Sequence, residues 1–436
     1  MHQSPKDIKK LLLSTIHTMA STASRFVKNP DKDFTRNRKI NFENVIHLLL
    51  TMGGKSLRDE ILEYFQCNVS TVTPSAFIQQ RDKILPSALA FLLDEFTNSS
   101  ADAKKYMGYR LLAVDGSDLN VSYDSEDTTT YLQIDDRRGF NLYHLNAMYD
   151  LINKVYVDAL IQPRRQFHEH RALVDMVDRS KITGKTIVIA DRGYEAYNVF
   201  AHVERKGWNY LIRVRDRDRH GIVTALELPD TDEFDIRTHV ILTNERTNEF
   251  KANKKLYRFI AKEHVFDYLD KDKNRYYPVY MRVVRFRLTK DTYETVITNL
   301  PEEGFSPDEL KELYAMRWGI ETSFRDLKHT IGLKYFHSKK AEFITQEIYA
   351  RLIMYNFCEM IIRNIIIQKE TTKYAYKVNF SAAVLICRYF LRFQGKGAPP
   401  DIEVLLQKNI IPIREGRNAL RRRGFKYAFN FLYRVS

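Results

Sequence analysis

The spacing of hydrophobic residues changes along the chain and predicts where helices give way to strands. Residues 1–105 carry the repeat of amphipathic helices, as in Phe42 to Met52 and in Ser75 to Phe96. From Tyr109 short apolar runs take over, separated by helical stretches that begin near His168 and cover 195–206. The expected strands cover residues 110–114, 142–151, 154–161, 186–190 and 210–214. Three strands followed by alternating helices and strands predict an α/β fold with a mixed sheet.

In the second half of the chain the pattern of polar and apolar residues changes twice more. Residues 215–290 are polar, with short alternating segments that predict a β-rich insertion, and Thr295 to Leu300 resembles a core strand again. Ser306 and Pro307 suit the N-cap and the first position of a helix. The expected divisions are an N-terminal helical DNA-binding domain (1–105), a first core part (106–214), the insertion (215–290), a second core part (291–340) and a C-terminal helical region (341–436).

The N-terminal region contains a possible helix-turn-helix. Thr73 suits an N-cap and Pro74 the first helical position. Two short helices joined by a turn would direct Gln79, Gln80 and Arg81 toward a DNA groove. The alternative, slightly favoured for the motif itself, is an ordinary bundle of helices that pack on their neighbours.

Charge and cysteine content limit the classes of binding partner and the cellular compartment that we expect. The formal net charge is +14, which favours a polyanion because Lys and Arg that neutralise phosphates release bound counterions. The basic cluster Arg421 to Arg423 favours the same contact. The three cysteines have no zinc-site spacing and indicate no disulfide framework, as expected in a reducing cytoplasm. No signal peptide is expected, and the apolar run Met360 to Ile367 is too short to span a bilayer.

Two acidic residues follow apolar strands. Asp115 comes after Leu111 to Val114, and Asp191 comes after Thr186 to Ala190. Strand ends form the crevice where ligands bind in open α/β sheets, so both carboxylates are expected at one edge. Each is also consistent with an aspartate in a turn beside glycine.

A third acidic residue belongs to a row of polar residues on an expected helix. Tyr314, Arg317, Glu321 and Lys328 have offsets of three, seven and fourteen residues, which place them on one helix face. The apolar stripe of the same helix borders this row: Leu313, Met316, Ile320, Phe324, Leu327 and Ile331. A surface ladder of charges is the alternative, but it explains neither the tyrosine nor the position beside the stripe.

These residue types suit phosphodiester chemistry. Two Mg²⁺ ions roughly 3.5–4 Å apart activate the attacking oxygen and stabilise the leaving one, and such ions prefer carboxylate oxygens. Asp115, Asp191 and Glu321 are therefore the expected metal ligands. Arg317 and Lys328 are expected to neutralise phosphates and Tyr314 to orient one. Trp318 is a candidate for stacking on a base, although a core or interface position is the more common one for tryptophan.

The row Tyr314-x2-Arg317-x3-Glu321-x6-Lys328 resembles the motif of the insertion-sequence-4 family of bacterial cut-and-paste transposases. The resemblance covers roughly residues 109–357 and includes the segment Ile189 to Tyr194. Asp118, three residues after Asp115, is a competing match for the first aspartate. The resemblance implies an RNase H-like core with an Asp-Asp-Glu triad, a β-strand insertion before the glutamate helix, and Mg²⁺ or Mn²⁺ as cofactor.

The resemblance further implies a homodimer that acts on paired terminal inverted repeats and on target DNA, with strand cleavage, strand transfer and, in several members, a hairpin intermediate. The alternatives are a structure-specific nuclease without strand transfer and a non-catalytic DNA-binding protein derived from a transposase. His168, Glu169 and His170 are expected to cap a helix or contact the core, and a supporting role near the metals is left open. A protein of this kind would work in the bacterial cytoplasm at the nucleoid.

Overall fold

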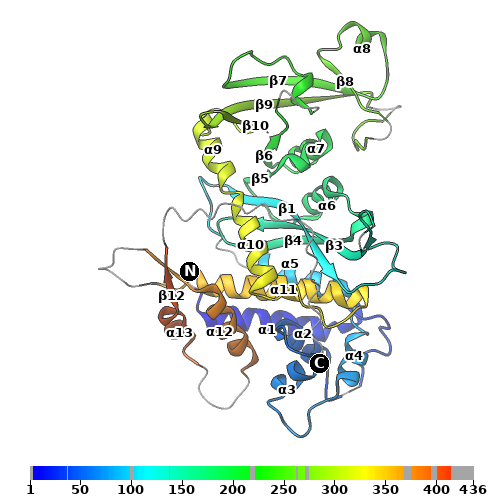
Figure 1. Ribbon diagram of the computed structural model, residues 1–436, viewed down its shortest axis with the longest axis vertical. Helices are drawn as coiled ribbons and strands as arrows, with labels where there is room; N and C mark the ends of the chain where they lie inside the picture. The colour runs from blue at the N-terminus through cyan, green and yellow to red at the C-terminus, as the bar shows by residue number, and fades with distance from the viewer. Residues whose placement is uncertain are drawn as a thin grey trace.

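The computed structural model describes residues 3–36, 38–98, 103–136, 138–216, 221–261, 264–270, 274–367, 375–393 and 400–413. A ten-stranded mixed sheet forms the centre of this described part, and helices pack on both of its faces. Figure 1 shows the β-rich insertion at one end of the molecule and the N-terminal helices at the other. The predicted α/β class is confirmed.

Five strands make up the half of the sheet that the first core part, residues 106–214, contributes. They are β1 (Arg110–Val121), β3 (Phe140–Asp150), β4 (Val155–Pro163), β5 (Thr186–Ala190) and β6 (Asn209–Val214), and their order is β4-β3-β1-β5-β6. The first three form an antiparallel meander, whereas β5 is parallel to both β1 and β6. The expected three-strand meander followed by alternating helices and strands is therefore confirmed.

The insertion continues the same sheet. After β6 comes β10 (Thr292–Thr298), which belongs to the second core part, and then the insertion strands β9 (Tyr276–Thr289), β7 (Phe234–Thr243) and β8 (Tyr257–Phe259) in that order. The short helix α8 (Asn248–Ala252) lies beside β8, and β2 (Tyr131–Leu132) pairs with β3 at the opposite edge. The predicted β-rich segment thus lengthens the core sheet, and β10 connects the two halves by pairing with both β6 and β9.

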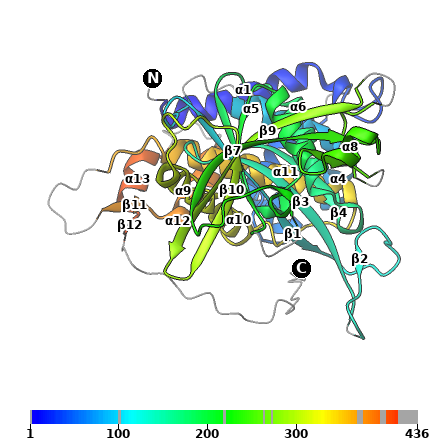
Figure 2. The same cartoon turned by 90° about the horizontal axis from the view of Figure 1, so that it is seen from above.

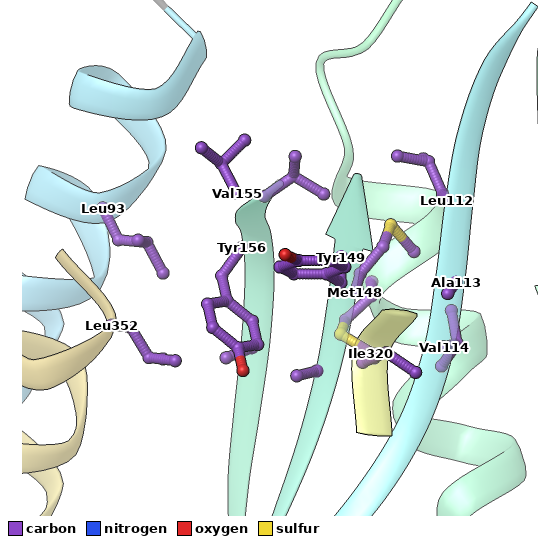
Figure 3. Packing of buried hydrophobic residues seen from close by; sticks show 14 of the residues in the cluster. Leu93, Leu112, Ala113, Val114, Met148, Tyr149, Val155, Tyr156, Ile320 and Leu352 are labelled. Atoms are coloured by element: carbon purple, nitrogen blue, oxygen red, sulfur yellow. The ribbon is translucent and has the colours of Figure 1, made fainter. Parts of the chain in front are cut away.

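The two faces of the sheet are covered by different helices. The helices α6 (Glu169–Arg179) and α7 (Tyr197–Arg205) cover one face of the sheet. The helices α9 (Pro307–Ala315), α10 (Trp318–His329) and α11 (Ala341–Ile362) lie on the opposite side of the sheet. Figure 3 shows buried side chains of β1, β3 and β4 facing Ile320 of α10, Leu352 of α11 and Leu93. The Tyr156 hydroxyl lies 2.8 Å from the Ser323 hydroxyl of α10, so a hydrogen bond joins this helix to β4.

The N-terminal helices pack against the C-terminal ones. They are α1 (Pro5–Ser21), α2 (Phe42–Thr51), α3 (Leu57–Tyr64), α4 (Pro74–Arg81) and α5 (Pro86–Asn98), and they meet α11 and α12 (Phe380–Arg392), while α13 (Ile402–Lys408) packs against α12. The strands β11 (Tyr376–Val378) and β12 (Ile410–Pro412) pair separately. Single turns of 3₁₀-helix occur at Ala23–Arg25 (η1), Arg164–Gln166 (η2), Arg192–Tyr194 (η3) and Val223–Ala225 (η4).

Thr73 and Pro74 begin α4 as predicted, with the Thr73 hydroxyl accepting a hydrogen bond from the Ala76 N–H. The single helix expected from Ser75 to Phe96 is wrong. The chain breaks after Arg81 and a new helix starts at Pro86, because proline lacks the N–H that a helix interior needs and fits only the first turn.

The proposed groove-reading residues do not share an exposed face. Gln79 is exposed, but Gln80 and Arg81 are buried, and the Arg81 guanidinium lies 3.0 Å from Glu347 of α11. Arg81 also donates to Gln346 and to the Phe343 carbonyl. Burial alone would raise the pKa of Glu347, but Arg81 and His337 lower it to about 2. Arg81 is thus a buried cross-link between the N-terminal helices and α11, and the groove role predicted for it is wrong.

In the described part of the chain no helix is long and apolar enough to cross a membrane. The predicted basic cluster Arg421 to Arg423 lies outside the described residues.

The buried Arg81–Glu347 pair should dominate the stability of this helical layer. Arg81→Met leaves the Glu347 carboxylate buried without its main counter-charge, so we expect the free energy of unfolding to fall by about 3–5 kcal/mol. Urea unfolding followed by circular dichroism measures it. The control is Lys181→Met, which removes a 62%-exposed lysine from its pair with Asp94 and should cost about 1 kcal/mol or less. Equal losses in the two variants would contradict this assignment.

Candidate active site

The register of two parallel strands brings the first two acidic residues together. Val114 of β1 pairs with Ala190, the last residue of β5, so Asp115 and Asp191 are the next residues on adjacent strands. Neighbouring strands lie about 4.8 Å apart, which makes these aspartates neighbours at the end of the parallel pairing. The Asp191 carboxylate accepts a hydrogen bond of 2.8 Å from the Gly193 N–H, which holds it at the turn.

The expectation that the first strand ends at Asp115 is wrong. Strand β1 continues to Val121 because β3 still pairs with it, and Asp115 lies opposite Ala147. Only the pairing with β5 stops at Val114. Asp115 therefore projects from a regular, hydrogen-bonded strand, and its side chain faces the sheet side on which α10 packs.

The predicted row of polar residues spans two helices. A single helix was expected, but α9 ends at Ala315 and α10 begins at Trp318. Met316 and Arg317 keep right-handed helical dihedral angles, and the Arg317 N–H bonds the Tyr314 carbonyl three residues back at 3.0 Å. The chain thus tightens to 3₁₀ geometry at this point and keeps the row in register. Ser306 caps α9 and Pro307 holds its first position as predicted, and Glu309 completes a capping box.

Arg317 connects two of the three acidic residues. Its guanidinium nitrogens lie 2.8 Å from a Glu321 oxygen and 3.7 Å from Asp115 Oδ2. The arginine side chain is only 8% exposed, whereas the two carboxylates are 22% and 28% exposed, so the pairing occurs at the rim of the core. The structure therefore brings Asp115 and Glu321 to one cation, on an edge where Asp191 is the neighbour of Asp115.

Negative charge at this edge is only partly compensated. The pKa of Asp115 is raised to about 6, chiefly by burial and in smaller part by the charges of Asp191 and Glu321, while the Gly116 N–H and Arg317 act in the opposite direction. A carboxyl group that resists ionisation beside two other acids is typical of a site built to receive positive charge.

The donor chemistry of the site fits a hard divalent cation, since all three acidic side chains offer oxygen ligands. Among the described residues, however, no three acidic, histidine or cysteine side chains are gathered closely enough to hold a metal ion as they stand. The Arg317 guanidinium occupies the place between Asp115 and Glu321 and supplies the positive charge there. A cation that binds both carboxylates has to displace it.

The other predicted residues lie around this centre. Tyr314 is buried with its hydroxyl unpaired among the described residues, and burial raises its pKa to about 12 against the opposing effect of Arg317 and Arg213. Lys328 donates to the Asp118 carbonyl at 2.8 Å, and burial lowers its pKa to about 8. Trp318 is 56% exposed, so a core position is excluded.

The competing aspartate, Asp118, has another environment. Its carboxylate lies 2.7 Å from His144 Nδ1 and 3.2 Å from Arg164. It lies three positions after Asp115 on β1 and therefore on the other face of the sheet. The geometry favours Asp115 over Asp118 as the partner of Asp191.

Three further residues lie near the centre: sequence reasoning missed Arg213 and Tyr194, and it left a supporting role for Glu169 open. The guanidinium of Arg213, on β6, lies 2.9 Å from a carboxylate oxygen of Glu294, and the charge of Asp191 also acts on it. Tyr194 is fully buried, and the charges of Glu169, Asp115 and Asp191 act on its hydroxyl. The sequence signal for Tyr194 was its place just after Asp191, and Glu169 stood in the His-Glu-His segment. His168 caps α6, as expected, by accepting from the Arg171 N–H.

The family model of the transposase DDE domain matches residues 106–357, which include all of the site described above. The chain belongs to this family. It is a DDE transposase, an enzyme class that acts on DNA with divalent metal ions. No curated protein matches the sequence. Among solved structures, the chain is similar to a piggyBac transposase in a cryo-EM synaptic complex with hairpin DNA, with 9% sequence identity, a TM-score of 0.46, and coverage of 89% of this chain and 80% of that one.

Close packing beside Asp115 gives a test of the site geometry. A Cβ on Gly116 would lie 2.3 Å from His144 Nε2 and 2.9 Å from Glu169 Oε1. We therefore expect Gly116→Ala to lower the free energy of unfolding by about 1–3 kcal/mol, measured by urea titration, because buried side chains must shift. Ser117→Ala on the same strand adds no atoms and should change stability by less than about 0.5 kcal/mol. A neutral Gly116→Ala would refute the packing.

Proposed function

We propose that this transposase excises and inserts its element by a cut-and-paste route of the insertion-sequence-4 type. The observation that carries the proposal is the pairing of Asp115 and Glu321 with one arginine, at the sheet edge where the strand register makes Asp191 the neighbour of Asp115. The spacing of Tyr314, Arg317, Glu321 and Lys328 supports assignment to that family.

The three carboxylates would hold two Mg²⁺ or Mn²⁺ ions. When bound, such ions lower the pKa of water and stabilise charge on the attacking and leaving oxygens. In the first reaction a water oxygen attacks phosphorus and a 3′-hydroxyl leaves with a proton. In strand transfer that 3′-hydroxyl attacks a phosphodiester of the target, one P–O bond forms and another breaks, and no external energy source is needed.

The basic residues around the carboxylates would position DNA. Arg317 is held by Asp115 and Glu321 in the free protein, and cation binding would release its planar guanidinium to a phosphate. The unpaired Tyr314 hydroxyl lies beside it and would donate to the same strand. Exposed Trp318 has one open side for an unpaired base.

The substrate would be a pair of terminal inverted repeats held by a homodimer, followed by target DNA. The N-terminal helices and the net charge of +14 support a separate DNA contact outside the active site. The predicted domain boundaries at 105, 214, 290 and 340 remain part of this proposal.

Incubation of purified protein with oligonucleotides carrying the element ends tests the proposal. Glu321→Gln should abolish cleavage in Mg²⁺ while end binding stays within about twofold, and EDTA should do the same to the wild type, because both remove cation binding and not DNA contacts. Glu312→Gln on the exposed side of α9 is the matched control and should cleave normally.

Strand-transfer products support the full transposase. Cleavage without joining would point to a nuclease, and shifted but uncut DNA to a binding protein. Normal cleavage by Glu321→Gln would remove this residue from the mechanism.

The phosphate contact proposed for Lys328 makes DNA binding sensitive to pH. Burial lowers its pKa to about 8, so the side chain is cationic at pH 7 and about nine-tenths neutral at pH 9. We expect end affinity to fall by up to about tenfold between these values in the wild type, and by much less in Lys328→Arg, which keeps its charge. Fluorescence anisotropy at constant ionic strength measures both. Parallel profiles would argue against this contact.

A further inference from the structure

We propose that Glu169 is a fourth carboxylate of the active site and binds a divalent cation beside Asp191. The inference rests on the proposed function, in which Asp115, Asp191 and Glu321 hold the ions. It adds a ligand from α6, on the sheet face opposite to α10. Carboxylates from both sides of the sheet edge would then bind the cations.

The position of the Glu169 carboxylate is the first observation. Its Oε1 lies 2.9 Å from the point where a Cβ would stand on Gly116, next to Asp115. Its Oε2 lies 3.4 Å from the corresponding point on Gly193, and Asp191 Oδ1 lies 2.9 Å from that same point. One oxygen thus faces the backbone after the first aspartate, and the other approaches the same point beside Gly193 as the carboxylate of the second aspartate. Because Gly116 and Gly193 have no Cβ, space remains beside both for the Glu169 carboxylate.

The support for this carboxylate engages only one of its oxygens. His144 Nε2 lies 3.3 Å from Oε1, and the other ring nitrogen of His144 contacts Asp118, which Arg164 holds in turn. The Glu169 side chain is 31% exposed, so its carboxylate is open to solvent as well as paired with His144. The ion pair engages Oε1, and Oε2 remains on the side of Gly193 and Asp191.

Tyr194 supplies an independent observation. Its side chain is 1% exposed, and within the described chain its hydroxyl has no hydrogen-bond partner. Burial raises its pKa, and among neighbouring charges Glu169 comes first, followed by Asp115 and Asp191. The hydroxyl therefore faces these acids without bonding any of them. A buried donor left unpaired is costly, and a hydrated cation among the carboxylates would satisfy it through one of its waters.

Charge balance favours the same arrangement. Two divalent cations carry four positive charges, whereas the proposed triad carries three negative ones. Glu169 supplies the fourth, so Arg317 would be free to leave its two carboxylates for a phosphate. Mg²⁺ and Mn²⁺ take oxygen ligands and retain some waters, which matches four carboxylates and a tyrosine that donates to water.

Manganese binding to the metal-free full-length protein tests the assignment without relying on activity. Free Mn²⁺ is measured by electron paramagnetic resonance during titration with MnCl₂, in the absence of DNA. We expect Glu169→Gln to weaken at least one bound Mn²⁺ by about tenfold or more, as Asp191→Asn does, because each removes a charged ligand of the same volume. Glu303→Gln, at an exposed loop position, is the control and should bind like the wild type.

The outcomes separate the two levels of the proposal. Wild-type Mn²⁺ binding by Glu169→Gln, together with weakened binding by Asp191→Asn, overturns the fourth ligand and leaves the triad intact. Unchanged binding in both variants overturns the cation site itself. Circular dichroism checks the fold of each variant. Should Glu169→Gln not fold, Glu169→Asp keeps the charge and withdraws the oxygens by one methylene, so wild-type affinity in that variant would contradict the proposal.

Discussion

Mutual repulsion among acidic side chains at one end of the parallel strands is the constraint on which this site depends. Carboxylates brought together where water is partly excluded cannot all ionise without nearby positive charge. In the free protein Arg317 supplies that charge, at 2.8 Å from Glu321 and 3.7 Å from Asp115. The pKa of Asp115, raised to about 6 chiefly by burial, shows that the compensation is incomplete. A positively charged ligand would complete the compensation.

The scaffold enforces this proximity through backbone pairing and buried contacts. The register of β1 and β5 makes Asp115 and Asp191 neighbours whatever their side chains prefer. Helix α10 cannot move away easily, because Ile320, Phe324 and Leu327 are buried and Ser323 is bonded to Tyr156 of β4. Behind it, α11 is fixed to the N-terminal helices by Arg81 and by Arg351, which donates to the Met52 and Gly53 carbonyls. The repulsion is therefore sustained by packing energy spread over the whole molecule.

Sequence periodicity predicted those features that depend on local preferences. Strand β5 was predicted with its observed bounds, and the N-caps at Thr73 and Ser306 were correct, since short-range hydrogen bonds decide them. The extent of β1 beyond Asp115 was not predictable, because pairing with β3 extends it across polar residues. The exposure of Trp318 and the burial of Arg81 likewise depend on which helix packs alongside. Glu169 was noticed only as part of a motif, and its place beside Asp191 required the fold.

Arg317 links the two binding steps of the proposed chemistry, cation binding and DNA binding. The same guanidinium cannot neutralise Asp115 and Glu321 and grip a phosphate with full strength at once. A cation that takes over the carboxylates makes the arginine available, and a phosphate that draws the arginine away leaves the carboxylates in greater need of a cation. Cation and DNA binding are then reciprocally coupled, because each must raise the affinity for the other by the same factor. A transposase built in this way would bind divalent cations more tightly with DNA than without it, which would favour hydrolytic chemistry in the DNA-bound state.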